Sequence, residues 1–284
     1  VRRAVAKTGI KNIACAGGVF MNVKANKRLS ELPEVEKMFI FPSCGDETNV
    51  FGAVWYAYRN IFNGSLKGLE PFKNMYFGND ITNKDIENYM RDTKFTFTYE
   101  KSSNVNSAVG KLLSENSVVA RASGRMEFGA RALGNRSILS NASDLENVQL
   151  INQMIKKRDF WMPFAPVILD KSEKDYIINP KNIESKFMIM SYETTDLRKD
   201  IIGAVHQADL TARPQVINRN DNKDYYDILN SYKKYTGYGG MMNTSFNIHG
   251  LPIVSDVKDA MYVFDNSGLE YMQISDYIIS KKEQ

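Results

Sequence analysis

Apolar runs separated by glycine-rich turns dominate the first seventy residues. Short apolar runs at 12–16 and 35–41 predict two buried strands. Apolar residues with helical spacing follow at 19–29 and 49–62, and they predict a helix after each strand. Alternating strands and helices are typical of parallel α/β structure, and this section is long enough for only part of such a sheet.

The pattern starts again after a loop at residues 63–71, which predicts a domain boundary. We therefore expect two domains, residues 1–70 and 71–284, in a protein of the α/β (α+β) class. Residues 206–216 are expected to form a strand paired with 186–191. The other strands of the second domain are expected at 94–99, 117–121, 164–169, 241–245 and 271–280. Its helices are expected at 83–91, 105–116, 144–157, 221–237 and 257–266.

Composition limits the class of function. The 284 residues are 43% hydrophobic and 25% charged, which is ordinary for a soluble globular protein. A net charge of +4 does not favour nucleic acid and suits an anionic small molecule. No run approaches the roughly 18 apolar residues of a membrane span. Cys15 and Cys44 lack metal or redox spacing and no signal peptide follows Val1, so we expect a cytoplasmic protein.

Residues 124–137 contain three arginines, three glycines and one glutamate, shortly after the strand predicted at 117–121. Glycines let backbone N–H groups approach an anion, and guanidinium groups bind phosphate or carboxylate oxygens in pairs. We therefore expect an anion site that includes Arg125, Arg131 and Arg136. The alternative is a surface loop whose arginines are solvated.

Two polar turns in the first domain also follow predicted strands, and ligands of α/β proteins collect at the carboxyl ends of strands. Gly17 and Gly18 permit close approach of the backbone, and Asn22 suits a hydrogen bond to a ribose, a base or a carbonyl. The alternative is a tight turn between strand and helix. Asp46 suits a metal ion or a role as a base, and the alternative is a helix N-cap.

Two further sets of polar residues lie in the second domain. Lys156 and Arg158 are two residues apart at the end of a predicted helix, where they would hold phosphates together or merely complement the helix dipole. Ser245 and Asn247 face one side if the segment is extended. That pair suits a phosphate, a carbamoyl group or a magnesium ion, and the alternative is a polar turn.

Polar residues recur at every second position from Asp209 to Gln215, which matches one face of a strand and favours a substrate-binding face. The second domain is therefore predicted to form an anion site for nucleotide phosphates. The basic residues available to it are Arg125, Arg131, Arg136, Lys156, Arg158 and Arg213.

These blocks, in order along nearly the whole chain, resemble the O-carbamoyltransferases that make carbamoylated antibiotics and nodulation factors. In the main block Ala130 stands where the family usually has proline, a departure expected to alter loop stiffness rather than chemistry. The blocks that carry the resemblance are residues 17–22, 45–46, 124–137, 152–158, 161–166, 206–215, 243–247 and 250–254.

The resemblance implies a YrdC-like fold for the second domain, in which carbamoyl phosphate and ATP give carbamoyl adenylate, pyrophosphate and inorganic phosphate. Lys156, Arg158, Ser245 and Asn247 match the family's K-x-R…S-x-N signature and would be catalytic, with Mg²⁺ accompanying ATP. Positive groups would stabilise the transfer, and no side-chain nucleophile is required. The residues expected to bind phosphate and nucleotide are Arg125, Arg131, Arg136, Arg213, Asn243 and Thr244.

The family's preceding domain resembles the actin-like ATPase (ASKHA) fold and moves the carbamoyl group from the adenylate to an acceptor hydroxyl. Gly17, Gly18 and Asn22 would contact the carbamoyl adenylate there. Asp46 aligns with an aspartate that binds Fe²⁺ together with two upstream histidines, whereas both histidines of this chain lie in the other domain. We therefore expect the C-terminal half of a family member, with the last part of the transfer domain and an incomplete transfer site.

Two other classes of function stay open. One is a threonylcarbamoyl-adenylate synthase that serves tRNA modification, and the blocks at 17–22 and 45–46 weigh against it. The other is a nucleotide-binding module without turnover. The expected partners are small molecules, namely carbamoyl phosphate, ATP and an unnamed hydroxyl acceptor, with neither nucleic acid nor a membrane. The oligomeric state is open, with a homodimer among the candidates.

Overall fold

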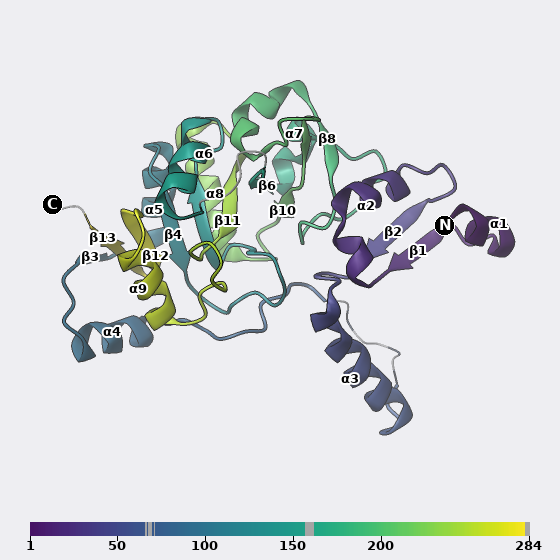
Figure 1. Ribbon diagram of the computed structural model, residues 1–284, viewed down its shortest axis with the longest axis horizontal. Coiled ribbons are helices and arrows are strands. Elements are labelled where there is room, and N and C mark those ends of the chain that lie inside the picture. The colour runs from purple at the N-terminus through teal and green to yellow at the C-terminus, as the bar shows by residue number, and fades with distance from the viewer. Residues whose placement is uncertain (66, 68–69, 71, 157–161, 282–284) are drawn as a thin grey trace.

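The computed structural model describes residues 1–65, 67, 70, 72–156 and 162–281, and Figure 1 shows how their helices and strands are arranged. The strands are β1 (Asn12–Cys15), β2 (Lys37–Ile40), β3 (Thr98–Lys101), β4 (Val119–Ala122), β5 (Arg136–Ser140), β6 (Ala165–Leu169), β7 (Ile177–Ile178), β8 (Tyr192–Thr194), β9 (Thr211–Ala212), β10 (Gln215–Ile217), β11 (Gly240–Ser245), β12 (Tyr271–Ile274) and β13 (Tyr277–Ser280).

The α-helices of the described residues are α1 (Arg2–Thr8), α2 (Val23–Ser30), α3 (Asn49–Asn60), α4 (Asn83–Asp92), α5 (Val105–Ser114), α6 (Glu146–Ile151), α7 (Glu173–Tyr176), α8 (Lys223–Thr236) and α9 (Val257–Asp265). None of these helices combines the length and the apolar character needed to cross a membrane.

The largest sheet has eight strands in the order β10-β6-β11-β5-β4-β12-β13-β3. It is a mixed sheet, because β4 runs parallel to β12 and antiparallel to β5. The two smaller sheets are the parallel pair β1-β2 and the antiparallel sheet β7-β8-β9. The fold is therefore mixed α/β, and the first seventy residues contain a piece of parallel sheet, as their pattern predicts.

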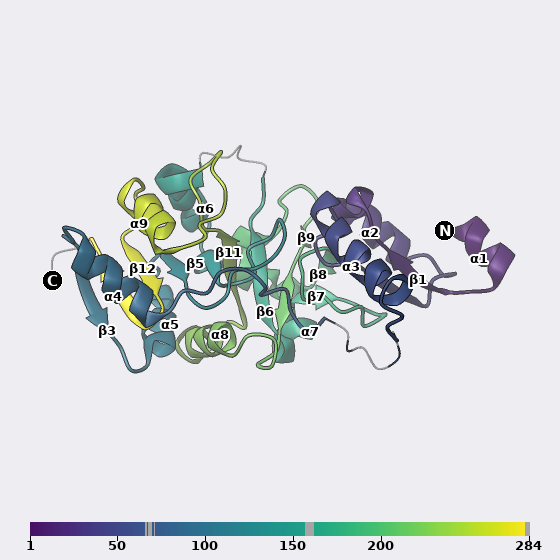
Figure 2. The ribbon, with the colours of Figure 1, turned by 90° about the horizontal axis from the view of Figure 1, so that it is seen from below.

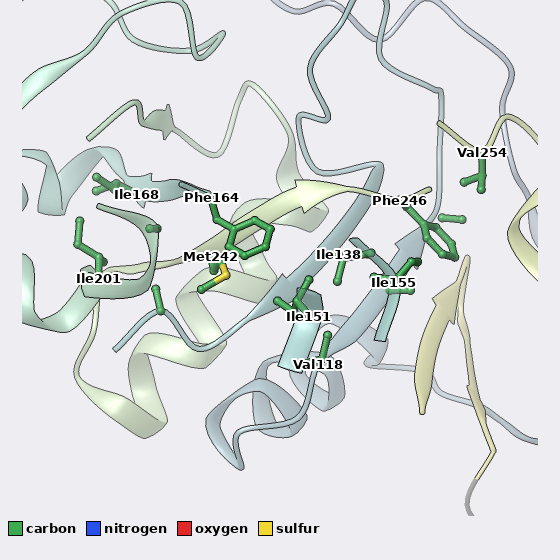
Figure 3. Close-up of a cluster of buried hydrophobic side chains, with 14 of the residues drawn as sticks. Val118, Ile138, Ile151, Ile155, Phe164, Ile168, Ile201, Met242, Phe246 and Val254 are labelled. Carbon is green, nitrogen blue, oxygen red and sulfur yellow. The ribbon is translucent and has the colours of Figure 1, made fainter. Parts of the chain in front are cut away.

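Helices cover both faces of the large sheet (Figure 2). Val119 and Leu139 point toward α5 and α8, whereas their neighbours Ala120 and Ile138 belong to the core on the opposite side. That second core contains α6 and α9, and Figure 3 shows part of it. Successive residues of a strand face opposite sides, so a strand with no polar face predicts this three-layer arrangement.

α5 and α8 approach each other closely at Gly110. A Cβ built on Gly110 would lie 2.6 Å from the Cβ of Ser231 and 2.9 Å from the backbone nitrogen of Tyr232. We expect Gly110→Ala to lower the free energy of unfolding by about 1–3 kcal/mol, because the helices must separate. Urea denaturation measures this change.

Gly52→Ala is the matched control for Gly110→Ala. Gly52 lies in α3, where a Cβ would meet nothing within 4 Å. The better helix propensity of alanine is expected to raise stability there by up to about 1 kcal/mol. If Gly110→Ala and Gly52→Ala lost equal stability, the close contact at Gly110 would not be the cause of the loss.

Hydrogen bonds tie the first seventy residues to the rest of the chain. Asn26 of α2 is buried, and its Nδ2 donates to the carbonyl of Ile189 at 2.7 Å. Lys181 donates from its Nζ to the carbonyls of Leu32 at 2.8 Å and Val35 at 2.6 Å. The predicted division into domains at residue 70 stays a prediction.

The structure corrects the predicted pairing of 186–191 with 206–216. Residues 186–191 form no strand, and Met188 has a φ of 55°. Residues 206–216 are interrupted: β9 pairs with β8, and β10 pairs with β6 in another sheet. Pro214 lies between β9 and β10, and proline lacks the N–H group that a continuous ladder requires.

Three other elements differ from the predicted pattern. The helix predicted at 144–157 ends as α6 and continues as a π-helical turn, Asn152–Lys156. The strand predicted at 271–280 is the hairpin β12-β13, which turns at Ser275 with a φ of 49°. The central strand β5 begins inside the Gly/Arg stretch, where only a loop was expected.

Candidate active site

Backbone N–H groups of the Gly/Arg loop, residues 124–137, already bind an anion. That anion is the buried carboxylate of Glu127, whose Oε1 accepts hydrogen bonds from the amides of Leu133 at 2.7 Å, Asn135 at 2.7 Å and Arg136 at 3.2 Å. We expected the loop amides to approach a bound ligand, and for these three amides that expectation is wrong. The sequence contains Glu127 but gives no signal that it faces inward.

Side chains of two strands hold carbonyl groups of the same loop. Asn243 of β11 donates from Nδ2 to the carbonyl of Ala132 at 3.0 Å. Gln215 of β10 donates from Nε2 to the carbonyl of Leu133 at 3.2 Å. The loop is thus fixed through its amides on one side and its carbonyls on the other, which preorganises the side chains that it carries.

A cavity of about 90 Å³ lies between this loop, the start of β6 and the end of β11. Arg131 and Arg213 line it, and its described lining has neither aspartate nor glutamate. At about 30 Å³ for each water, it matches roughly three waters, which fits a phosphate or carbamoyl group rather than a nucleotide. The other lining residues are Ala130, Ala132, Pro163, Phe164, Ala165, Met188, Asn243, Thr244 and Ser245.

The ammonium group of Lys156 is buried beside the end of β11. Its Nζ donates to the carbonyl of Ser245, and lies 3.2 Å from the hydroxyl of Ser245, 3.1 Å from the carbonyl of Asn247 and 2.7 Å from Oδ1 of Asn247. The Ser245 hydroxyl donates to the same Oδ1 at 2.6 Å. These four acceptors on Ser245 and Asn247 thus share the three N–H protons of Lys156.

The Lys156 cluster (Lys156, Ser245 and Asn247) brings together three of the four residues predicted to be catalytic. The π-helical turn directs Lys156 toward β11, and π-bulges are frequent at functional sites. Buried Ile155 and Phe246 are drawn in Figure 3 and fix the chain on either side of the cluster. The fourth residue, Arg158, lies outside the described residues.

Arg136 serves the fold, and its predicted contact with phosphate stays a prediction. Its side chain is fully buried at the start of β5. Burial lowers the pKa of Arg136 to about 10, and the Glu127 carboxylate opposes that shift. Its guanidinium donates to the backbone carbonyls of Asn79 at 3.0 Å, Ser123 at 3.4 Å, Gly124 at 3.0 Å, Asn135 at 2.9 Å and Ser255 at 3.2 Å.

The other two arginines differ from Arg136 and from each other. Arg125 is exposed and donates to the carbonyls of Phe77 at 2.9 Å and Gly78 at 3.3 Å, away from the described cavity lining. Its position therefore lends no support to the predicted phosphate contact. Arg131 is half-buried on the cavity wall, where burial lowers its pKa.

The predicted residues of the first domain take structural positions. Gly17 has a φ of 102°, and Asn22 caps α2 by accepting from the amide of Ala25 at 3.0 Å, as the turn alternative predicts. Asp46 begins a 3₁₀ turn and makes no side-chain cap, so the N-cap alternative is wrong. The proposed contacts of Gly17, Gly18 and Asn22 with carbamoyl adenylate stay predictions.

Within the described residues, no group of three or more His, Cys, Asp or Glu side chains is arranged to hold a metal ion. Asp46 therefore does not find, in the described part of the chain, the partners that an iron site would need.

A larger hollow of about 600 Å³ lies at α5 and α8. Lys223 and Lys234 line it together with Asp224, Asp227 and Asp276, so its charges are of both signs. None of the residues predicted from the sequence to bind phosphate is in its described lining. We therefore place the candidate active site at the smaller cavity, whose charged residues in the described lining are both arginines.

Known protein families match this arrangement of blocks. The family model described as "Carbamoyltransferase C-terminus" matches residues 110–281, and that described as "Carbamoyltransferase N-terminus" matches residues 2–55. The chain belongs to the carbamoyltransferase family. The C-terminal match includes the Gly/Arg loop, the cavity and the Lys156 cluster.

Relatives of this carbamoyltransferase family member come from archaea and bacteria. An uncharacterised protein of Methanocaldococcus jannaschii is 36% identical over 280 residues, covering 96% of this chain and 51% of that protein. Nodulation protein NolNO of Sinorhizobium fredii is 31% identical over 277 residues, covering 97% of this chain and 40% of that protein. The chain spans about half the length of the curated relatives that it matches.

A partial likeness to a solved structure is also found. Full-length HypF in its phosphate- and nucleotide-bound form aligns with a TM-score of 0.42 and 18% identity, covering 65% of this chain and 22% of that chain.

Proposed function

We propose that this chain belongs to an enzyme that activates a carbamoyl group on ATP, for transfer to an acceptor hydroxyl. Residues 71–284 would be a YrdC-like domain that forms carbamoyl adenylate, and residues 1–70 the last part of an actin-like ATPase (ASKHA) domain that transfers the group. The observation that carries this proposal is the cavity with Arg131 and Arg213 and no carboxylate in its described lining.

The proposed reaction consumes carbamoyl phosphate, ATP and water. Water takes the phosphoryl group of carbamoyl phosphate, which breaks the P–O bond and leaves carbamate and inorganic phosphate. A carbamate oxygen then attacks the α-phosphorus of ATP, and the bond to the β-phosphate oxygen breaks. The products are carbamoyl adenylate, pyrophosphate and inorganic phosphate.

The residues of the cavity suit this reaction by their charge and placement. Two anionic substrates repel each other, and Arg131 and Arg213 would offset that repulsion and the charge that develops on phosphoryl oxygens. Lys156 would add a positive charge beside Ser245, where β11 ends. The cavity admits the reacting group alone, so the rest of the nucleotide would lie outside its described lining.

The test is pyrophosphate release from ATP by this chain in the presence of magnesium and carbamoyl phosphate. We expect release that requires carbamoyl phosphate and falls roughly 10²-fold in Arg131→Ala, by analogy with the loss of a preorganised charge donor. Arg125→Ala removes the same charge from the same loop outside the cavity lining, and a smaller effect is expected.

Other outcomes of that assay favour the other functions. Release that depends on threonine and bicarbonate instead would indicate a threonylcarbamoyl-adenylate synthase. Nucleotide binding without release under either condition would indicate a binding module. Equal effects of the Arg131 and Arg125 substitutions would contradict the placement of the site at this cavity.

A further inference from the structure

Two polar atoms of residues on the cavity wall have no hydrogen-bond partner among the described residues. They are Nε of Arg131, which is a donor, and Oδ1 of Asn243, which is an acceptor. Both atoms are closed off from solvent, so water does not satisfy them. Buried polar groups are nearly always paired in folded proteins, and an unpaired one calls for a functional or structural reason.

The surrounding contacts determine which end of the Asn243 amide is unpaired. The carbonyl of Ala132 can only accept, so the Asn243 nitrogen must be the atom that faces it at 3.0 Å. Strand pairing with Leu139 of β5 and Ala165 of β6 holds Asn243 inside the sheet. The acceptor Oδ1 is thus fixed next to the loop segment that carries Arg131.

We propose that Arg131 and Asn243 recognise the carbamoyl group itself, an inference that rests on the proposed function. Nε of Arg131 donates to the carbonyl oxygen of the ligand, and Oδ1 of Asn243 accepts from its NH₂ group. Phosphate oxygens offer acceptors and would satisfy Arg131 alone, whereas a carbamoyl group carries an acceptor and a donor side by side. Both atoms have almost no accessible surface, so binding in this way requires the wall at residues 130–132 to shift.

Gln215 provides a matched comparison for Asn243. Its Nε2 holds the next carbonyl of the loop, that of Leu133, at 3.2 Å, and its Oε1 is likewise buried without a partner among the described residues. Gln215 is not among the described residues that line the cavity. Loss of its amide therefore loosens the loop without removing the proposed acceptor.

The test compares the affinities of carbamoyl phosphate, acetyl phosphate and inorganic phosphate by titration calorimetry. Acetyl phosphate has a methyl group in place of NH₂ and cannot donate to Asn243. We expect the unmodified chain to bind carbamoyl phosphate about tenfold tighter than acetyl phosphate, because a buried acceptor stays unpaired with the analogue. Asn243→Ala is expected to bring this ratio close to one, and Gln215→Ala to weaken all three ligands while keeping the ratio.

Equal affinities of the unmodified chain for the carbamoyl and acetyl compounds would overturn the inference, and this comparison stands even if Asn243→Ala does not fold. An unchanged ratio in folded Asn243→Ala would overturn it as well. Pyrophosphate release separates it from the proposed function. Selective binding without release supports carbamoyl recognition and contradicts adenylate formation, whereas release without selective binding does the reverse.

Discussion

Lys156→Met is expected to lower kcat/KM for pyrophosphate release by roughly 10²–10³-fold. Methionine keeps the length and apolar part of the side chain but has no proton to donate. The substitution removes every donor that Lys156 offers to Ser245 and Asn247, together with the positive charge at the end of β11. Initial rates at several concentrations of carbamoyl phosphate and ATP measure the effect.

For Lys156→Met, the free energy of unfolding has to be measured together with the activity. The acceptors on Ser245 and Asn247 lose their donor, which is expected to cost about 1–3 kcal/mol in the free energy of unfolding. Lys111→Met removes an exposed lysine of α5 that pairs with Glu115 on the surface, and both activity and stability are expected to change little. Activity within twofold of the unmodified chain in folded Lys156→Met would show that Lys156 merely joins the π-helical turn to β11.

Arg136→Met is expected to lower the free energy of unfolding by about 3–5 kcal/mol. The guanidinium of Arg136 is fully buried and holds carbonyls from three separate parts of the chain, near residues 79, 124 and 255. Without it those carbonyls remain buried with fewer donors, and each unsatisfied group adds a desolvation cost. Urea denaturation and the shift in Tm measure the loss.

Arg125→Met is the control for that measurement, because it removes a second arginine from the same loop. Arg125 is exposed, and water can replace its bonds to Phe77 and Gly78, so a loss below about 1 kcal/mol is expected. If Arg136→Met were as stable as Arg125→Met but had lost phosphate binding, Arg136 would belong to the site, as its sequence position predicts.

The arginines of the Gly/Arg loop show where prediction from sequence stops. Arg125, Arg131 and Arg136 stand in similar surroundings along the chain, and the sequence predicts one anion site for all three. In the fold one is exposed, one lines the cavity and one is fully buried. All three carry the same charge within one short stretch, so only the neighbours brought by other elements distinguish them.

The sequence pattern also failed to predict the start of β5, for a related reason. A buried strand that begins with an arginine contradicts the apolar pattern by which strands are predicted. Carbonyls from distant segments make that burial tolerable. Pro214, by contrast, is a local signal for the interruption between β9 and β10, which the prediction of one strand at 206–216 did not take into account.

The sequence by itself determined the mixed α/β class, most helices and strands, and the blocks that place the chain among the carbamoyltransferases. Periodicity and turn chemistry act over a few residues, so they can be read locally. The tertiary structure alone decided that the Glu127 carboxylate accepts hydrogen bonds from the loop amides and that Arg131 lines the cavity. It also joined Asn243 to Ala132 and Lys156 to Ser245, across 111 and 89 residues. Such contacts depend on how strands are ordered in the sheet, which no local pattern specifies.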